Sequence, residues 1–168
     1  LEIPVPTVEH AVRLAKKHGA KVVLDPAPAR LLPDSLLGMI DFLTPNQVEA
    51  EVLTGMRISS PATAMKAAAR LRQRGARHIL VKLGANGVFY LGPDRGEHIH
   101  GYRIKPVDTT AAGDAFNAGL AVALDRGDCM TAAVSYANAV AALSVTKPGA
   151  QSSMPTAAEV EDFFTAQS

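Results

Sequence analysis

The chain has 168 residues, 48% of them hydrophobic, so it is long enough and apolar enough to bury the core of one domain. Its formal net charge is +1 and its basic residues form no stripe, so we expect no nucleic-acid partner. No apolar run has the length of a membrane span and the first residues carry no signal-peptide pattern, so we expect no membrane partner and a cytoplasmic location.

The first half of the chain alternates helical and extended patterns. Apolar residues have helical spacing from Thr7 to Gly19, after which "KVVLDP" predicts a buried strand that a proline ends. The stretch "ARLLPDSLLGM" is irregular with one helical turn, and "IDFLT" predicts a second strand. A short helix is expected over "NQVEAEVLTG", with Gly55 beyond its end, and Ser60 followed by Pro61 opens a helix through "ATAMKAAARLRQRG".

The second half begins with strands and ends with helices. "HILVKLG", "GVFYLG" and "HIHGYRI" predict strands joined by the glycine-rich turns "GANG" and "GPDRG". Helices are then expected from Ala112 to about Arg126, from Asp128 to about Val145 and from Thr156 to about Ala166. Alternating helices and strands favour parallel βα units and a layered α/β sheet in one domain, residues 1–168. The visible parallel strands are fewer than such sheets usually contain, so we expect residues absent from this chain to supply part of the sheet.

The stretch "VDTTAAGDAF" places a carboxylate where a helix is about to begin. A helix N-terminus attracts anions, and the small residues Ala111, Ala112 and Gly113 allow a phosphate to approach the backbone closely. Asp114 would repel a phosphate there, but it could take a proton from an attacking hydroxyl group. The alternative is that Asp114 is a favourable first-turn acid and the alanines only pack. The sequence contains neither a G-x-x-x-x-G-K-[ST] loop nor a G-x-G-x-x-G fingerprint.

Together with "LTPNQVEAE", "VKLGANG" and "VTKPGAQSSMP", this stretch closely resembles the ribokinase/PfkB family of carbohydrate kinases. The motifs occur in unbroken order over essentially the whole chain. "DPAPARLLPDSLL", and the alanines where most of the wider family has Gly-Ala-Gly-Asp, resemble the ribose-phosphorylating members. The resemblance implies an αβα sandwich with a mostly parallel sheet, and transfer of the ATP γ-phosphoryl group to the 5-hydroxyl of D-ribose.

The resemblance also implies roles for single residues. Asp114 would be the catalytic base that contacts the sugar hydroxyl, and the N–H groups of Ala111, Ala112 and Gly113 would form an anion hole. These roles agree with the residue-level reading, because phosphoryl transfer depends mainly on positioning and charge neutralisation.

Asn46 and Glu49 match the family's N-x-x-E motif, which implies a role in holding Mg²⁺ and the phosphates, partly through water. The residues support this independently, because Asn46 opens a helix after Pro45 and Glu49 lies three positions later on the same face. A capping arrangement with glutamate at the third helical position is the structural alternative, and both can hold.

Nucleotide contacts are implied for the turn "KLGANG", that is for Lys82, Gly84, Asn86 and Gly87, where glycines leave room for the backbone to approach a ligand. Many related turns begin with threonine where this chain has Lys82. Asn138, on the penultimate helix, matches an adenine-side position of the family.

A monovalent cation, usually potassium, is implied beside the anion hole. Asp108 and Ser153 would contribute side-chain oxygens and the others backbone carbonyls. The matching positions are Asp108, Thr110, Ser144, Lys147, Gly149 and Ser153.

Near the start of the chain, Glu2 matches a sugar-contacting glutamate of the family. The family's N-terminal portion, with its sugar-binding aspartate, Gly-Gly pair and β-lid, has no counterpart here. We therefore expect the C-terminal, nucleotide-binding part of a kinase whose complete form is a homodimer, and we expect this part alone to be inactive.

Other functions stay open. A related sugar or nucleoside kinase would share this half, and a non-catalytic nucleotide-binding module would bind ATP without turnover. A dinucleotide-dependent oxidoreductase is disfavoured by the absent glycine fingerprint.

Two further features have structural interpretations. His98 and His100 lie on one face of a predicted strand without a third ligand nearby, so we expect no metal there. Cys129 is the only cysteine and has no basic cluster near it, so we expect a buried structural thiol in a reducing compartment.

Overall fold

The computed structural model describes residues 1–167. Contacts within the chain divide it into two compact units. The N-terminal unit comprises residues 1–83 and 89–98, and the C-terminal unit comprises residues 84–88 and 99–167. None of the helices in this described part of the chain is both long enough and apolar enough to cross a membrane.

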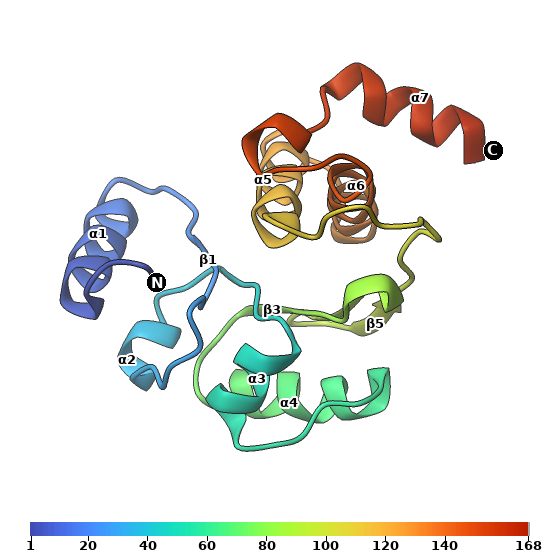
Figure 1. Ribbon diagram of the computed structural model, residues 1–168. Coiled ribbons are helices and arrows are strands. Elements are labelled where there is room, and N and C mark those ends of the chain that lie inside the picture. The colour runs from blue at the N-terminus through green and yellow to red at the C-terminus, as the bar shows by residue number, and fades with distance from the viewer. Residues whose placement is uncertain (168) are drawn as a thin grey trace. The chain divides into compact units, whose positions relative to one another are not determined.

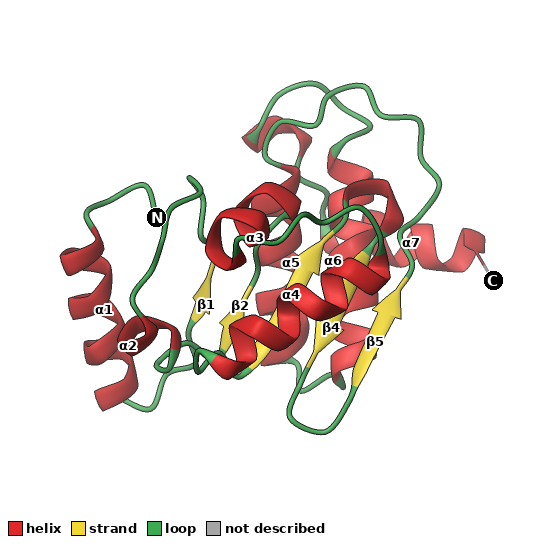
Figure 2. Ribbon diagram, turned by 90° about the horizontal axis from the view of Figure 1, so that it is seen from below, coloured by secondary structure: helices red, strands yellow, loops and turns green. Residues whose placement is uncertain are grey.

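A five-stranded sheet in the order β1-β2-β3-β4-β5 organises the N-terminal unit (Figure 2). β1 (Val23–Leu24), β2 (Phe42–Leu43) and β3 (His78–Lys82) are parallel neighbours. β4 (Val88–Leu91) and β5 (Gly96–Ile99) are joined by a four-residue turn, which only an antiparallel hairpin permits. The predicted layered α/β fold is therefore confirmed, with a mixed sheet whose first three strands are parallel.

Helices of the N-terminal unit flank this sheet. They are α1 (Val5–Lys17), α2 (Asp34–Leu37), α3 (Gln47–Thr54) and α4 (Pro61–Gln73), and Figure 2 shows α3 and α4 in front of the strands. α4 begins at Ser60, whose hydroxyl accepts the N–H of Thr63 in a capping box. It buries Ala64, Ala67, Ala68 and Leu71 at helical spacing, and the same core contains Ile79 and Val81 of β3.

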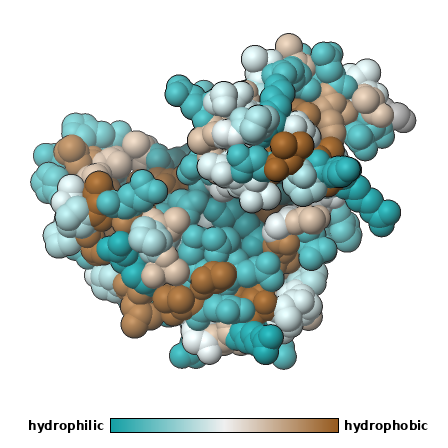
Figure 3. Space-filling view, viewed as in Figure 1, coloured by the Kyte–Doolittle hydropathy of each residue, from teal (hydrophilic) through white to brown (hydrophobic). Residues whose placement is uncertain are grey.

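Some apolar side chains of α3 and α4 stay at the surface. Val48 and Val52 on α3 and Met65 on α4 are exposed. Figure 3 shows brown, hydrophobic side chains gathered over these helices. The buried faces of the two helices and this outer patch lie on different sides of them.

The C-terminal unit is mainly helical, with α5 (Ala112–Asp125), α6 (Met130–Ser144) and α7 (Ala157–Gln167), and with the single turn η2 (Gln151–Ser153). α5 and α6 pack side by side (Figure 1). Gly119 permits this contact, because a Cβ atom there would lie 2.9 Å from Cγ2 of Val140. Tyr102 packs edge-on against Phe163 of α7 at 4.9 Å between ring centroids.

Two local predictions are wrong. The strand expected over "HIHGYRI" is instead β5 (Gly96–Ile99), because the backbone of Gly101 leaves the sheet to pack against the turn at residues 84–87. A Cβ atom on Gly101 would lie 2.7 Å from the Ala85 carbonyl oxygen. Cys129 is exposed rather than buried, since it occupies the N-cap position of α6, outside the buried face of that helix.

Candidate active site

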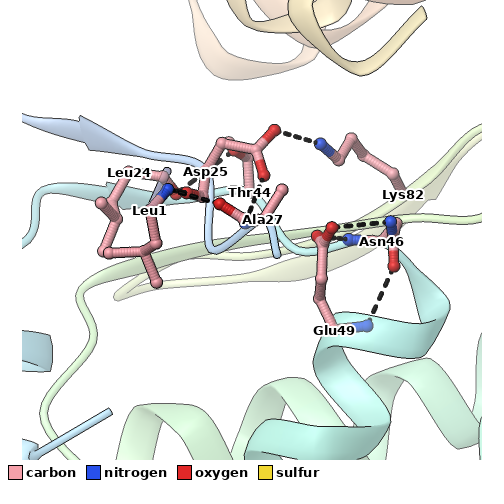
Figure 4. Close-up of polar contacts among 8 residues, drawn as sticks. All are labelled: Leu1, Leu24, Asp25, Ala27, Thr44, Asn46, Glu49 and Lys82. Atoms are coloured by element: carbon pink, nitrogen blue, oxygen red, sulfur yellow. Dashed lines mark hydrogen bonds and ion pairs between the residues drawn. The ribbon is translucent and has the colours of Figure 1, made fainter. Parts of the chain in front are cut away.

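Polar residues gather at the carboxyl ends of the three parallel strands. Asp25 follows β1, Thr44 follows β2 and Lys82 ends β3. Figure 4 shows these side chains together with Asn46 and Glu49 at this edge of the sheet. In open α/β sheets this edge is the usual position for ligands, because loops and helix N-termini converge there.

The Asn46–Glu49 pair forms the expected capping box and also brings its oxygens together. The Asn46 side chain accepts the N–H of Glu49 at 2.9 Å. The two carboxylate oxygens of Glu49 accept the backbone N–H of Asn46 at 2.7 Å and its side-chain amide at 2.8 Å. The functional and the capping interpretations are thus compatible, because a single network fixes both side chains at the start of α3.

The Glu49 carboxyl group is buried, and this raises its pKa above the ordinary value. The hydrogen bond from Asn46 opposes this shift, as does the Lys82 ammonium, while the Asp25 carboxylate adds to it. The pKa of Glu49 therefore depends on the charges of Asp25 and Lys82 as well as on burial.

The Lys82 side chain reaches across to the end of β1. Its Nζ donates to Oδ2 of Asp25 at 2.7 Å, and its backbone N–H donates to the Pro45 carbonyl at 2.8 Å. Sequence reasoning assigned Lys82 to nucleotide contact and did not identify Asp25. The available signal was a carboxylate directly after the predicted strand "KVVL", at the same sheet edge as Asn46.

The turn after β3 has the backbone geometry expected for a close approach to a ligand. Gly84 and Gly87 have φ of +58° and +82°, with the turn η1 (Gly84–Asn86) between β3 and β4. A Cβ atom on Gly87 would lie 2.2 Å from the Ile99 carbonyl oxygen, so glycine is required there. Gly84 and Asn86 are exposed, so the backbone of this turn is accessible.

In the C-terminal unit, Asp114 lies on the first turn of α5 and is exposed. Ala111, the N-cap residue, has φ of +59° and is the only non-glycine residue with positive φ among residues 1–167. This strained conformation is typical of functional turns. The N–H of Ala112 donates to the Thr109 carbonyl at 3.2 Å, so one of the three expected anion-hole donors already has a backbone partner.

Asp108 connects two of the loops expected to surround a monovalent cation. Its carboxylate accepts the hydroxyl of Thr110 at 2.7 Å and the N–H groups of Thr110 and Gly149, each at 2.9 Å. These hydrogen bonds, with that from the Thr110 hydroxyl first, lower the pKa of Asp108 to about 2. The carboxylate therefore stays ionised and pins the residue 108–110 loop to the residue 145–149 loop.

The side chains of three other expected cation residues have partners of their own. The buried hydroxyl groups of Ser144 and Ser153 donate to the carbonyls of Ala141 and Ala150, at 2.9 Å and 2.8 Å. The Lys147 ammonium pairs with Glu159 at 2.7 Å. Because an ammonium group cannot ligate a cation, Lys147 could contribute only its backbone carbonyl to such a site.

The remaining predicted residues have simple settings. Asn138 is buried on α6 and its amide donates to the His100 carbonyl at 3.2 Å. Glu2 is exposed. His98 lies on β5 and His100 lies beyond it, and no group of three or more histidine, cysteine, aspartate or glutamate side chains placed to hold a metal occurs within residues 1–167.

The donor sets suit hard cations. Mg²⁺ prefers oxygen ligands and usually keeps several waters. The oxygens of Asn46 and Glu49 each already accept an N–H, which fits contact to Mg²⁺ through water. The Asp108 carboxylate and the carbonyls of its two loops are likewise oxygen donors suited to a monovalent cation.

Residues 1–157 match the model of the pfkB family of carbohydrate kinases. The chain belongs to this family. It is 46% identical over 164 residues to a ribokinase of Haemophilus influenzae, covering 98% of this chain and 54% of that protein. It is 37% identical to a deoxyribokinase of Salmonella typhi, again covering 98% of this chain and 54% of that protein.

Solved structures agree with this assignment. Arabidopsis thaliana ribokinase complexed with ribose and ATP matches with a TM-score of 0.91 and 34% identity, over 96% of this chain and 53% of that one. The chain thus spans about half the length of the relatives it matches.

Proposed function

We propose that this chain is the nucleotide-binding and catalytic-base part of an ATP-dependent sugar kinase that phosphorylates the 5-hydroxyl of D-ribose. The observation that supports this most is Asp114, a carboxylate exposed on the first turn of α5, directly after a turn of small residues with a left-handed N-cap. Family membership and the ribokinase similarity support the same reaction.

Asp114 accepts the proton of the sugar 5-hydroxyl group while the oxygen of that hydroxyl attacks the γ-phosphorus. The bond from the γ-phosphorus to the oxygen that bridges it to the β-phosphate breaks, and ADP leaves with that oxygen. In the described part of the chain no hydrogen bond or ion pair to the Asp114 side chain is found, so its oxygens are available to a substrate hydroxyl. This role needs an ionised carboxylate within hydrogen-bond reach of the hydroxyl.

The negative charge that develops on the transferring group is met by backbone donors at the start of α5. The N–H groups of Ala111 and Gly113 act with the positive end of the helix dipole, and Ala112 joins them when its turn bond to Thr109 opens. When bound, Mg²⁺ neutralises charge on the phosphates. Asn46 and Glu49 would hold the ion through its water ligands, and the turn from Gly84 to Gly87 would contact the nucleotide.

The identity of the sugar rests on similarity. Identity to the ribokinase is 46%, compared with 37% to the deoxyribokinase, so ribose is favoured. The second candidate is therefore a related sugar kinase that shares this half. A non-catalytic nucleotide-binding module would bind ATP without phosphorylating any sugar.

The decisive experiment measures ADP release by a full-length protein that contains this chain, with ribose, 2-deoxyribose or a nucleoside as acceptor. We expect turnover with ribose that requires Mg²⁺ and is stimulated by K⁺. If turnover occurred only with another acceptor, that acceptor would replace ribose as the proposed substrate. If no acceptor supported turnover, the proposal that the protein is a kinase would be wrong. A calorimetric titration of the 168-residue chain is expected to show binding of Mg-ATP and not of ribose.

A further inference from the structure

The Lys82 side chain crosses the carboxyl end of β2. It leaves the end of β3, and its Nζ lies 2.7 Å from Oδ2 of Asp25 at the end of β1 (Figure 4). The buried Thr44, at the end of β2, donates its hydroxyl to the Leu24 carbonyl at 3.3 Å in the same layer. The lysine side chain thus connects the end of β3 with the end of β1, at the edge that also holds Asn46 and Glu49.

Asp25 is itself fixed in position. Its Oδ1 accepts the N–H of Ala27 at 3.1 Å, while its Oδ2 accepts the Lys82 ammonium. The side chains of Asp25 and Lys82 are only 25% and 12% exposed, respectively. Removing either partner from such a pair leaves a poorly hydrated charge, so each charge strongly determines where the other lies.

Within the described part of the chain, no cationic group contacts the carboxyl group of Glu49. The Lys82 ammonium is bound to the Asp25 carboxylate, and the N-terminal ammonium donates to the backbone carbonyls of Asp25 and Ala27. Glu49 receives N–H groups of Asn46, which carry no charge, and no ion pair to Glu49 is found among residues 1–167. The Glu49 carboxyl group is therefore hydrogen-bonded to Asn46 but has no cation of these residues in contact with it.

We propose that Asp25 is a positioning residue: it holds the Lys82 ammonium at the end of β1 and so leaves Glu49 the negative charge that attracts the divalent cation accompanying the nucleotide. The proposal deepens the proposed function and rests on it. Without Asp25, the flexible lysine turns toward Glu49, the other carboxylate of the cluster, and takes the place of the divalent cation. Without Lys82, two carboxylates face the cation together.

The two single substitutions consequently act in opposite directions. Asp25→Asn should weaken divalent-cation affinity and Lys82→Met should strengthen it, each by about 3- to 10-fold for partly screened charges at this range. The double variant D25N/K82M removes both charges and should lie close to the unmodified chain. A purely structural pair would instead weaken cation binding in both single variants.

The test uses Mn²⁺ alone, without nucleotide, added to the isotopically labelled chain. Paramagnetic broadening of the amide signals of Asn46 and Glu49 reports the apparent affinity in all four proteins. Lys16→Met is the matched control, because it removes a lysine from another ion pair of the same unit, that with Asp41 at 2.8 Å, and should leave the affinity unchanged.

The proposal would be overturned if the apparent Mn²⁺ affinity changed in the same direction in the two single variants, or if it changed by less than twofold in them. So would the absence of Mn²⁺ broadening at Asn46 and Glu49 in both the unmodified chain and Lys82→Met. If Asp25→Asn fails to fold, the test compares the Mn²⁺ affinities of Lys82→Met and the double variant. Lys82→Met must bind Mn²⁺ more tightly than the unmodified chain, and the double variant must lose that gain. Sugar turnover is measured separately, so loss of the kinase proposal and loss of this one give different results.

Discussion

The two units present their candidate functional groups in opposite ways. In the N-terminal unit, Asn46, Glu49, Asp25 and Lys82 are held by one another and by backbone groups. In the C-terminal unit, Asp114 is exposed on the first turn of α5, and within the described residues its side chain has no such partners. Groups that only position charge gain from being fixed in advance, whereas a base must keep its oxygens available for the substrate.

The largest effect is expected where a side chain acts in the reaction itself. Asp114→Asn should lower kcat of a full-length protein by about 100- to 10,000-fold, because a positioned general base is lost. The melting temperature should hardly change, since the side chain is exposed and contributes no packing. The assay is ADP release with saturating ribose, and wild-type-like turnover would show that another group takes the proton.

The next effect concerns the nucleotide turn of the C-terminal unit. Gly87→Ala should lower the free energy of unfolding by at least about 3 kcal/mol, because strain at positive φ adds to a backbone clash. That Cβ atom would lie 2.2 Å from the Ile99 carbonyl oxygen.

Gly84→Ala is the matched control for this substitution. Its φ is +58°, but a Cβ atom there has nothing within 4 Å. The expected loss is about 1 kcal/mol, from backbone strain alone. Urea denaturation of the two variants measures the difference. Equal losses of unfolding free energy would mean that the close backbone approach at Gly87 does not contribute to stability.

A smaller effect separates capping from ligand binding at the start of α3. Asn46→Ala and Ser60→Ala each remove the N-cap of a capping box, so each should cost about 1 kcal/mol of stability. Only Asn46→Ala should also weaken Mg-ATP binding in a calorimetric titration. Equal nucleotide affinity in the two variants would mean that the Asn46–Glu49 pair only caps α3 and does not contribute to nucleotide binding.

The smallest effect is a pH dependence in the N-terminal unit. His78 stacks on Phe42 at 4.9 Å between ring centroids, and its Nδ1 lies 2.9 Å from the Tyr90 hydroxyl. Burial lowers the pKa of His78 below 6.5, so below that pH the unfolded chain takes up a proton that the folded chain resists. Stability should therefore fall as the pH decreases from about 7 to 5.

His78→Phe isolates the contribution of this group. The variant keeps a ring against Phe42 but cannot titrate, so its denaturation midpoint should decrease less over the same pH range. Parallel pH profiles of the two proteins would assign the dependence to other groups.

The local elements follow from short stretches of sequence. Ser60-Pro61 and Asn46 with Glu49 predict their helix starts, because capping partners lie within one turn of each other. The small residues before Asp114 likewise predict the turn that begins α5. The prediction that Cys129 is buried is wrong, because the number of cysteines in a chain does not indicate whether a residue at a helix N-cap is buried.

The sequence by itself determined the order of the elements and the family, and it identified Asn46, Glu49 and Asp114 as candidates, because those signals lie within a few neighbouring positions. Only the tertiary structure revealed the Asp25–Lys82 pair, whose members are 57 positions apart. The parallel register of β1, β2 and β3 brings their carboxyl ends to one edge, and no local pattern specifies which side chains meet there. The charge that Glu49 experiences is therefore a property of the folded sheet.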